Sequence, residues 1–358
     1  MYDPTQPPGR QGFYMPPEWA PHAATWLAWP HKEASWPGKL DRIPPIFAAM
    51  ARALTPGEPV HINVPDAAMG EAAREVLAAA DVDLDAITLH EIPFDDSWIR
   101  DHGPIFLNHR SGEQAIVDWE YNAWGGKYRP YDRDNVVPEA IAAGLNLLVW
   151  RPGLVLEGGS IDVDGAGLLL TTESCLLNPN RNPGRTRAEI EAALRDYLGV
   201  SRILWLGEGI AGDDTDGHVD DLTRFVAPGV VATVVEERRS DDNYEPLRAN
   251  LARLRGMTGS SGRPLEIHTL PMPDAVVCAG QRLPASYANF YIGNRVLLLP
   301  QFGCPQDAVA HRTLAALFPG REVVDIDCRD LIWGLGAFHC LTQQQPQPSR
   351  NGSAKPGP

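Results

Sequence analysis

Residues 154–175 have the sequence LVLEGGSIDVDGAGLLLTTESC, in which two apolar runs flank an Asp-Gly pair. Asp-Gly between such runs is the strongest short-range signal for a β-hairpin, because both residues tolerate the positive φ angles of a tight turn. The stretch therefore predicts strand, turn and strand. Glu157 and two glycines stand near its start, which places a carboxylate at the entrance of the hairpin.

The same pattern recurs along the chain. Paired apolar runs with short turns occupy 98–120, 218–237 and 288–300, and a fifth, less regular pair joins 24–30 to 60–65 across a helical insertion. Amphipathic segments between the hairpins predict helices. The clearest covers 184–199 and is expected to start near Thr186 and to stop at Gly199. The others cover 39–54, 66–80, 244–256 and 305–319, and Pro44 and Pro45 should confine the first of these to their C-terminal side.

Polar residues stand near the starts of successive hairpins at intervals of 61, 61, 71 and 51 residues: Asp96, Glu157, His218, Asn289 and Cys340. If the hairpin, helix and strand modules are arranged radially, these positions converge on one axis. The spacing therefore favours an α/β fold in which the modules are arranged radially, like the blades of a propeller. An ordinary α/β sandwich with a coincidental repeat is the alternative.

Length and composition predict a globular protein with either one large domain or two ordinary ones. Of the 358 residues, 44% are hydrophobic and 22% are charged, and no run approaches the ~18 apolar residues of a membrane span. We expect a single catalytic domain over residues 13–345. Residues 1–12 and 346–358 are rich in proline and small polar residues and are expected to be flexible.

Charge and cysteine content narrow the function classes. The net charge is 31 − 46 = −15, which disfavours nucleic acid and anionic membranes as partners and suits a cationic substrate. The five cysteines form no CxxC pair, and the N-terminus has no signal-peptide pattern. Reduced thiols in the cytoplasm are therefore expected. The sequence leaves homo-oligomer formation open.

Cys340 is the cysteine with the most unusual surroundings. It lies in GLGAFHCLTQQQP, residues 334–346, with His339 beside it. A buried, inert cysteine is the commoner case. A backbone opened by glycines can instead offer N–H groups to a thiolate and lower its pKa. Adjacent side chains in an extended segment point to opposite faces, so His339 is expected to face away from the thiol.

Two acidic segments supply candidates to accompany that thiol. In GDDTDGHVDD, residues 212–221, His218 and Asp220 would share one face of a strand, as a base and a charged clamp. A solvated acidic loop or a cation site is the alternative, although the spacing does not fit an EF-hand. In DDSWIRDHGP, residues 95–104, a carboxylate beside Trp98 could hold a planar cation, whereas Arg100 and Asp101 are expected to form an ion pair.

Eight motifs in this order resemble those of the agmatine deiminases, which belong to the bacterial-type peptidylarginine deiminase family of the guanidino-group modifying superfamily. The resemblance extends from residue 15 to residue 345. The motifs are DDSWIRDHGPIF, WEYNAWGGKY, LEGGSIDVDG, TTESCLLNPNRNP, TDGHVDDLTRF, ASYANFYIGN, LPQFG and FHCLTQQQP.

The resemblance implies a five-bladed α/β propeller and hydrolysis of the guanidinium of agmatine to a ureido group, with release of ammonia. By motif position, Cys340 would be the nucleophile, His218 the general acid and base, and Glu157 its acidic partner. The substrate-binding residues would be Asp96, Asp220, Trp98 and Trp119. No metal ligands and no organic cofactor are expected, because a thiolate attacks the guanidinium carbon directly.

The chain departs from the family pattern at two places near the site. Gly334-Leu335-Gly336-Ala337 replaces three glycines and an asparagine, and the segment before His218 is richer in acid than usual. These changes leave open a deiminase that acts on another guanidine or on peptidyl arginine. An amidinotransferase and a propeller that only binds ligands are more distant alternatives.

Overall fold

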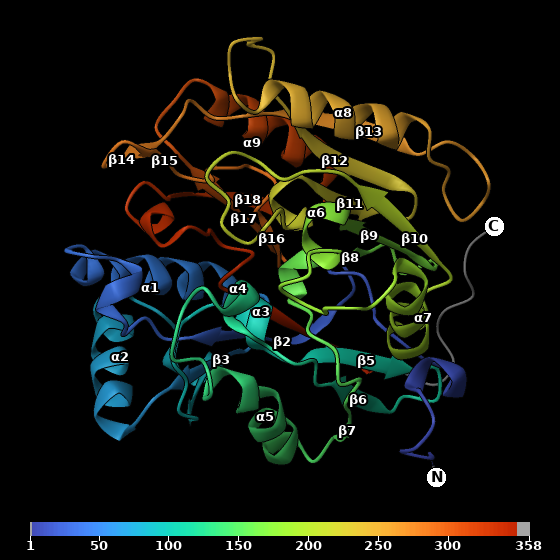
Figure 1. Ribbon diagram of the computed structural model, residues 1–358. Coiled ribbons are helices and arrows are strands. Elements are labelled where there is room, and N and C mark those ends of the chain that lie inside the picture. The colour runs from blue at the N-terminus through green and yellow to red at the C-terminus, as the bar shows by residue number, and fades with distance from the viewer. Residues whose placement is uncertain (1, 349–358) are drawn as a thin grey trace.

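The computed structural model describes residues 2–348, and in this part of the chain strands and helices form an α/β fold. Five sheets of three or four strands lie toward the middle of the molecule, and most of the longer helices lie outside them (Figure 1). The sequence prediction of an α/β fold is confirmed. Among the described residues, no helix is long and apolar enough to cross a membrane.

All five sheets share one strand pattern. An antiparallel pair is followed by a strand that runs parallel to the second member of the pair. Three sheets consist of β8 (Asp162–Val163), β9 (Leu168–Thr172) and β10 (Arg202–Leu206); β11 (Thr223–Ala227), β12 (Val230–Val235) and β13 (Glu266–Pro271); and β16 (Tyr291–Ile292), β17 (Val296–Gln301) and β18 (Glu322–Asp327). The three clearest hairpins of the sequence are therefore present.

The other two sheets have four strands each. One adds β1 (Phe13–Tyr14) to the edge of β5 (Ile105–His109), β6 (Gln114–Val117) and β7 (Leu148–Trp150). The other contains β19 (Gln343–Pro346), β2 (His22–Ala28), β3 (Val60–Val64) and β4 (Ile87–Glu91). A small separate pair joins β14 (Val277–Cys278) to β15 (Gln281–Arg282).

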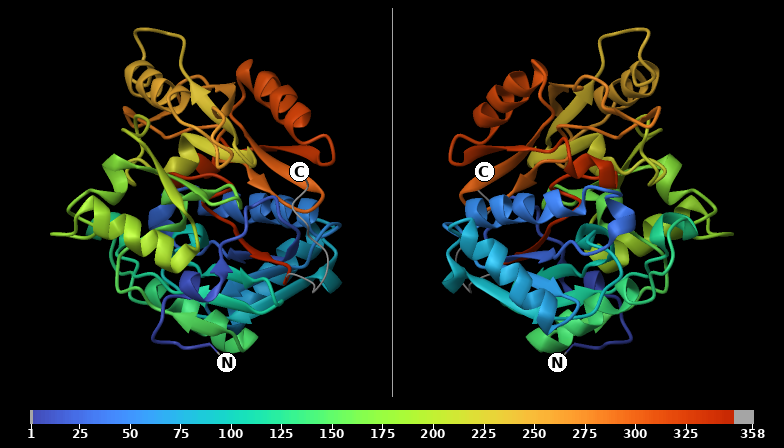
Figure 2. Two further views of the ribbon diagram at one scale, coloured as in Figure 1. Left: turned by 90° about the vertical axis from the view of Figure 1, so that its right-hand side faces the viewer. Right: turned by 90° about the vertical axis from the view of Figure 1, so that its left-hand side faces the viewer.

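The two ends of the described chain meet in one sheet. The fifth predicted pair, β2 with β3, is parallel, and the antiparallel partner of β2 is β19, with Trp26 opposite Gln343. Figure 2 shows the red C-terminal strand among the blue N-terminal segments. Because β19 lies next to β2, the segment that carries Cys340 is drawn into the interior.

Local sequence explains the helix ends. Helix α7 (Arg187–Leu198) begins with a capping box in which the Thr186 and Glu189 side chains each bind the other's backbone N–H, and it ends at Gly199 with φ 67°. Helix α1 (Ile43–Leu54) begins with its prolines in the first turn. The remaining long helices are α2 (Ala67–Ala79), α5 (Val137–Leu145), α8 (Tyr244–Arg255) and α9 (Gln306–Leu317).

The apolar side chains form three clusters. The largest contains the apolar faces of α1, α2, α8 and α9 with their neighbouring strands and extends to Cys340. The second lies between β5–β10 and α7, and the third lies between β2 and α5. Ile190, Leu194 and Leu198, which are spaced at helical intervals, bury one face of α7. The loops that form the site are joined to strands that pack in these clusters.

The N-terminal segment makes definite contacts although its composition indicates flexibility. Residues Pro8–Gln11 form a short 3-10 helix beside α7, where Arg10 forms an ion pair with Asp196 at 2.7 Å. The expected C-terminal tail, 346–358, begins at the last residue of β19, and residues 349–358 lie outside the described part of the chain.

Candidate active site

Five segments that each precede the first strand of a sheet carry the polar residues of the site. They are the segment with Asp96 and α3 (Ile99–His102) before β5, Glu157 and η6 (Gly158–Ser160) before β8, His218 and η7 (Val219–Asp221) before β11, Asn289 before β16, and Cys340 before β19. Helix α3 contacts η6, and η6 contacts η7. Arg100 N donates to Cys340 O at 3.2 Å, which joins the first segment to the last.

The Cys340 thiol is held by an amide and lies beside a carboxylate. Asn289 Nδ2 lies 3.0 Å from Sγ, while Asn289 Oδ1 accepts from the backbone N–H of His339 and of Cys340, at 3.0 and 3.3 Å. Asp220 Oδ2 lies 3.7 Å from Sγ. Only 6% of Cys340 is exposed. Asn289 thus fixes both the thiol and the loop that carries it.

His339 does not serve the thiol directly. Its Nδ1 lies 2.7 Å from Asp220 Oδ2, and its Nε2 lies 2.7 Å from Glu18 Oε2. Because both ring nitrogens are occupied by carboxylates, neither can take the thiol proton. His339 instead orients Asp220.

The surroundings of Cys340 oppose ionisation of the thiol. Burial raises its pKa well above the usual range, and the carboxylates of Asp220 and Asp221 add to this effect, whereas Asn289 partly offsets it. The expectation that the glycine-rich loop lowers the thiol pKa is therefore wrong for the unliganded protein. Burial and the acidic neighbours together outweigh one amide donor.

His218 and Glu157 lie close to each other. His218 Nε2 is 3.9 Å from Glu157 Oε2, and His218 Nδ1 is 3.7 Å from Asp101 Oδ1. Both ring nitrogens and Glu157 Oε2 are buried and have no hydrogen-bond partner within residues 2–348. Polar atoms in this state point to a ligand, because unpaired buried groups are destabilising.

Acidic neighbours keep His218 protonated. Burial alone would lower the pKa of the imidazole, but the Asp101 carboxylate, with Cys175 and Asp220, raises it well above its usual value. The charge on His339 and its hydrogen bond lower the pKa of Asp220 despite burial. A charged acid and a charged clamp thus face the same space.

Two positioning contacts were not foreseen from the sequence. Asp101 does not pair with Arg100: its oxygens accept from Gly159 N and Trp124 Nε1, each at 2.9 Å, and one of them faces His218. Arg181 donates to Glu157 Oε1 at 2.6 Å and so turns Oε2 toward His218. Arg100 instead reaches the backbone carbonyl of His339 and the glutamines that follow Cys340.

The predicted substrate residues Asp96 and Trp98 border the site. Asp96 is engaged by donors of its own chain, with Lys32 Nζ at 3.0 Å and Ser35 Oγ at 2.7 Å. Trp98 lies close to the thiol across Gly336, because a Cβ on that glycine would stand 2.5 Å from the indole and 3.2 Å from Cys340 Sγ.

Trp119 lies elsewhere. Its indole packs in the second apolar cluster, with its ring centroid 5.9 Å from that of Tyr197. The contacts of Trp119 therefore do not support a substrate-binding role. Trp124, which donates to Asp101, is the indole of the same motif that touches the site.

The acidic side chains of the segment before His218 form hydrogen bonds and ion pairs with the rest of the protein and are not simply solvated. Asp213 accepts from the backbone N–H of His218 at 3.1 Å. Asp216 accepts from Arg181 and Lys127 at 2.6 and 2.9 Å, and Asp214 accepts from the hydroxyl of Tyr128. These contacts hold His218 in place. They account for three of the acids in the segment.

Leu335, in the turn before Cys340, adopts a backbone conformation that favours glycine. Leu335 has φ 70°, a conformation that glycine adopts without cost and that costs other residues about 1 kcal/mol. Ala337 is fully buried in the main cluster. Leu335 also packs against that cluster, so its burial offsets the strain.

Gly159 is the point where three functional groups come closest. A Cβ at this position would lie 2.6 Å from His218 Nδ1, 2.8 Å from Asp101 Oδ1 and 3.0 Å from Asp220 Oδ2. We predict that Gly159→Ala lowers kcat/KM by roughly 5- to 150-fold, because overpacking costs about 1–3 kcal/mol and here falls on site atoms. Steady-state kinetics would measure the loss.

Gly144→Ala is the matched control, because nothing lies within 4 Å of a Cβ at that position in α5. It should leave kcat/KM unchanged. If both variants had wild-type kcat/KM, the close approach at Gly159 would be unimportant to the reaction.

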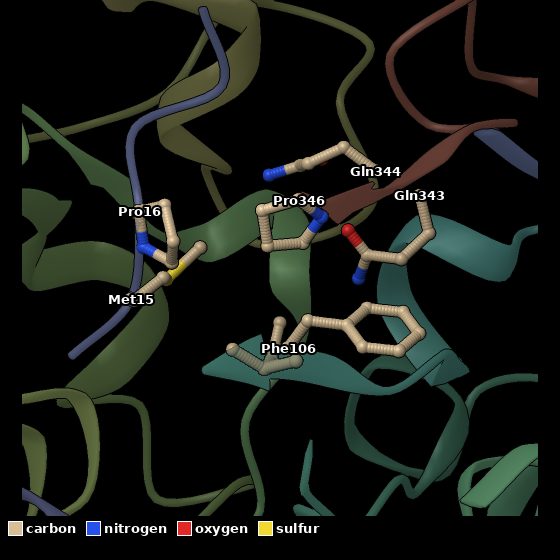
Figure 3. A pocket seen from close by; sticks show the side chains of 7 residues that line it. Met15, Pro16, Phe106, Gln343, Gln344 and Pro346 are labelled. Carbon is tan, nitrogen blue, oxygen red and sulfur yellow. The ribbon is translucent and has the colours of Figure 1, made fainter. Parts of the chain in front are cut away.

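The small cavity in Figure 3 is separate from these groups. It has a volume of about 10 Å³, which is room for about one water molecule, and it lies between β5 and β19. Its lining residues are Met15, Pro16, Ile105, Phe106, Gln343, Gln344 and Pro346. It contains none of the carboxylates of the site.

Comparison with known proteins covers nearly the whole chain. Residues 14–346 match the family model of the Porphyromonas-type peptidyl-arginine deiminases. The agmatine deiminase of Ectopseudomonas mendocina is 41% identical, over 96% of this chain and 98% of its own length. The structure of the Enterococcus faecalis agmatine deiminase superposes with a TM-score of 0.90 at 35% identity, covering 96% of this chain and 98% of that one. A substrate-bound agmatine deiminase of C. jejuni with a cysteine-to-serine substitution gives 0.86 at 28% identity, covering 94% and 97%.

Proposed function

The chain belongs to the Porphyromonas-type peptidyl-arginine deiminase family, and we propose that it hydrolyses the guanidinium of agmatine to N-carbamoylputrescine and ammonia. Relatives of about 40% identity carry the name agmatine deiminase. The observation that carries the proposal is the Cys340 thiol beside Asp220, together with a buried His218 and Glu157 whose facing atoms have no partner in the described chain.

The guanidinium would bind between the carboxylates. Asp220 Oδ1 is buried and has no hydrogen-bond partner in residues 2–348, so it can accept a guanidinium N–H. Asp96 could accept from the other side once Lys32 and Ser35 release it. Trp98 would stack on the planar cation. Two carboxylates would thereby hold and polarise a group that is otherwise a poor electrophile.

Binding would also activate the nucleophile. The raised pKa of Cys340 arises from burial and from negative neighbours, so a bound cation beside Sγ would lower that pKa. The thiol proton would leave to solvent as the guanidinium arrives. The thiolate would then form only when a cationic substrate is present.

The reaction would proceed in two halves. Sγ attacks the central guanidinium carbon, and the C–N bond to a terminal nitrogen breaks as His218 donates its proton, which releases ammonia. A thiouronium adduct on Cys340 remains. His218, now neutral, takes a proton from water, which attacks the same carbon, and the C–S bond breaks to give the ureido product. Glu157 and Asp101 would stabilise the imidazolium in each half.

The five-bladed propeller belongs to the same proposal. The shared pattern of an antiparallel pair and a parallel strand in all five sheets supports it, as does the convergence of five polar segments on Cys340. We also propose a cytoplasmic location, in keeping with five unpaired cysteines.

A substrate panel would test the function. The wild-type protein is incubated separately with agmatine, free arginine and a peptide ending in arginine, and the ureido product and ammonia are both measured. We expect product mainly from agmatine, with ammonia in equal amount. More product from free arginine or from the peptide than from agmatine would contradict the proposed agmatine specificity. Turnover only upon addition of an amine acceptor would indicate amidino transfer instead.

We predict that turnover needs no metal ion. Because the proposed nucleophile is a thiolate and the acid is an imidazolium, exhaustive treatment with a chelator should leave kcat at or above its starting value. Activity is measured after dialysis, with and without added manganese. A loss that manganese restores would contradict the mechanism.

A further inference from the structure

Cys175 lies beside the proposed acid and base although the mechanism does not use it. One ligand atom each from Glu157, Cys175 and His218 lie within 4.8 Å of one another, and all three residues are buried. Cys175 belongs to α6 (Glu173–Leu176), the short helix after β9. Its apolar sequence context, Ser-Cys-Leu-Leu, is that of an ordinary buried cysteine.

One threonine ties this cysteine to the histidine segment. Thr172 Oγ1 accepts from Cys175 N at 3.2 Å and donates to Gly217 O at 2.6 Å, directly before His218. These two hydrogen bonds hold the backbone at Cys175 and the backbone before His218 at a fixed separation.

The facing atoms of the other two residues have no hydrogen-bond partner in the described chain. Glu157 Oε1 is taken by Arg181, whereas Oε2 has no hydrogen-bond partner in the described chain and lies 3.9 Å from His218 Nε2. His218 Nε2 is likewise unpartnered. A thiol, an imidazole nitrogen and a carboxylate oxygen thus face a common point in the interior.

We propose that Glu157, Cys175 and His218 form a binding site for a soft divalent cation such as Zn²⁺. Thiolate, imidazole and carboxylate are the ligands that zinc prefers, and three of them leave the fourth tetrahedral position open. Binding releases the Cys175 thiol proton and the second imidazole proton to solvent. The negative charge of Asp101 and Asp220 nearby offsets the positive charge of Arg181 beside Glu157.

Occupation of this site inhibits the enzyme. A metal ion on His218 replaces the second imidazole proton, so the ring is no longer an imidazolium acid, and the ion places positive charge close to the point where a cationic substrate must bind. This consequence rests on the proposed function, whereas the metal site itself does not.

The binding test removes the proposed nucleophile first. Cys340→Ala protein is treated with chelator, dialysed and titrated with Zn²⁺ by calorimetry and with Co²⁺ by absorption spectroscopy. We expect one metal ion per chain and a near-ultraviolet thiolate-to-cobalt band. Absence of binding, or a cobalt spectrum with no thiolate band, overturns the site.

Two further variants identify the thiol. In the Cys340→Ala background, Cys175→Ala should remove the cobalt band and weaken Zn²⁺ binding by at least about 10-fold. Cys328→Ala, another fully buried cysteine, should change neither. A band that survives Cys175→Ala would assign the metal to another cysteine. Should Cys175→Ala fail to fold, Glu157→Gln gives the same test of zinc affinity through a different ligand.

Inhibition is tested separately in protein that keeps Cys340. Zn²⁺ should lower agmatine turnover reversibly, and the half-inhibiting concentration should rise at least about 10-fold in Cys175→Ala, relative to that variant's own uninhibited rate. An unchanged value contradicts the inhibitory role. If no ureido product forms from any guanidine, the proposed function fails, and the cobalt band still decides the metal site.

Discussion

Replacement of Cys340 by alanine is expected to abolish formation of the ureido product, lowering kcat/KM by at least about 10⁴-fold. The reason is that the buried thiol is the group held by Asn289 beside Asp220, and neither His339 nor any carboxylate of the site can form a stable covalent adduct in its place. The rate is measured by a ureido-specific colour reaction at saturating agmatine.

Adduct formation provides an independent measurement. Rapid acid quenching of the wild-type protein during turnover, followed by mass spectrometry, should find a species heavier by agmatine less ammonia on the peptide that contains Cys340. Cys328→Ala should keep normal turnover and the same adduct, because the backbone of the buried Cys328 bonds to Gln301 and Ile332, and no hydrogen bond joins it to the site residues within residues 2–348. More than trace product from Cys340→Ala would exclude the covalent mechanism.

Much of the fold follows from local sequence signals. The Asp-Gly turn, the capping box at Thr186 and the glycine after α7 each have one favourable conformation, so hairpins and helix ends could be predicted. The pairing of β19 with β2 could not, because its residues lie more than 300 positions apart and no turn connects them. Only the complete sheet makes that pairing favourable.

In the site, too, some residues could be predicted from local sequence and others could not. Cys340, His218 and Glu157 were recognisable because each stands at a recurring position in the modules and lies in a motif that resembles those of a known family. The partner of Asp101 was misassigned, since adjacency to Arg100 suggested an ion pair, whereas in α3 the two side chains point to different segments. Asn289 carried a usable signal, its position in the repeat. Glu18 carried none, because it precedes all the hairpins.

The charge around Cys340 was also hidden from the sequence. The glycines near the thiol are its neighbours in the sequence. Asp220 and Asp221, which are its acidic neighbours in the structure, come from a segment about 120 residues earlier. Their approach reverses the sign of the effect on the thiol pKa. Asp220 would therefore have two opposite roles. Before substrate binds, its charge helps to keep the thiol protonated, and in the substrate complex it would bind the guanidinium.

Asp220→Asn is therefore predicted to slow turnover while making the free thiol more reactive. Removal of the charged clamp should lower kcat/KM for agmatine by about 2–5 kcal/mol, which is roughly 30- to 5,000-fold. Because the Asp220 charge helps to raise the pKa of Cys340, its removal lowers that pKa, and more thiolate is present at any pH below it. Alkylation of Cys340 by iodoacetamide at pH 8 should accordingly be faster than in the wild type.

These opposite changes separate a specific role of Asp220 from general damage. A misfolded variant would lose turnover and expose all five cysteines, whereas here only the peptide containing Cys340 should gain label. Asp164→Asn is the matched control: this buried aspartate accepts from two backbone N–H groups at 2.8 Å, contacts that the amide oxygen can keep, so both rates should stay within about 2-fold of wild type. If Asp220→Asn kept wild-type turnover, or if alkylation slowed together with turnover, Asp220 would be neither the clamp nor the charge that holds the thiol protonated.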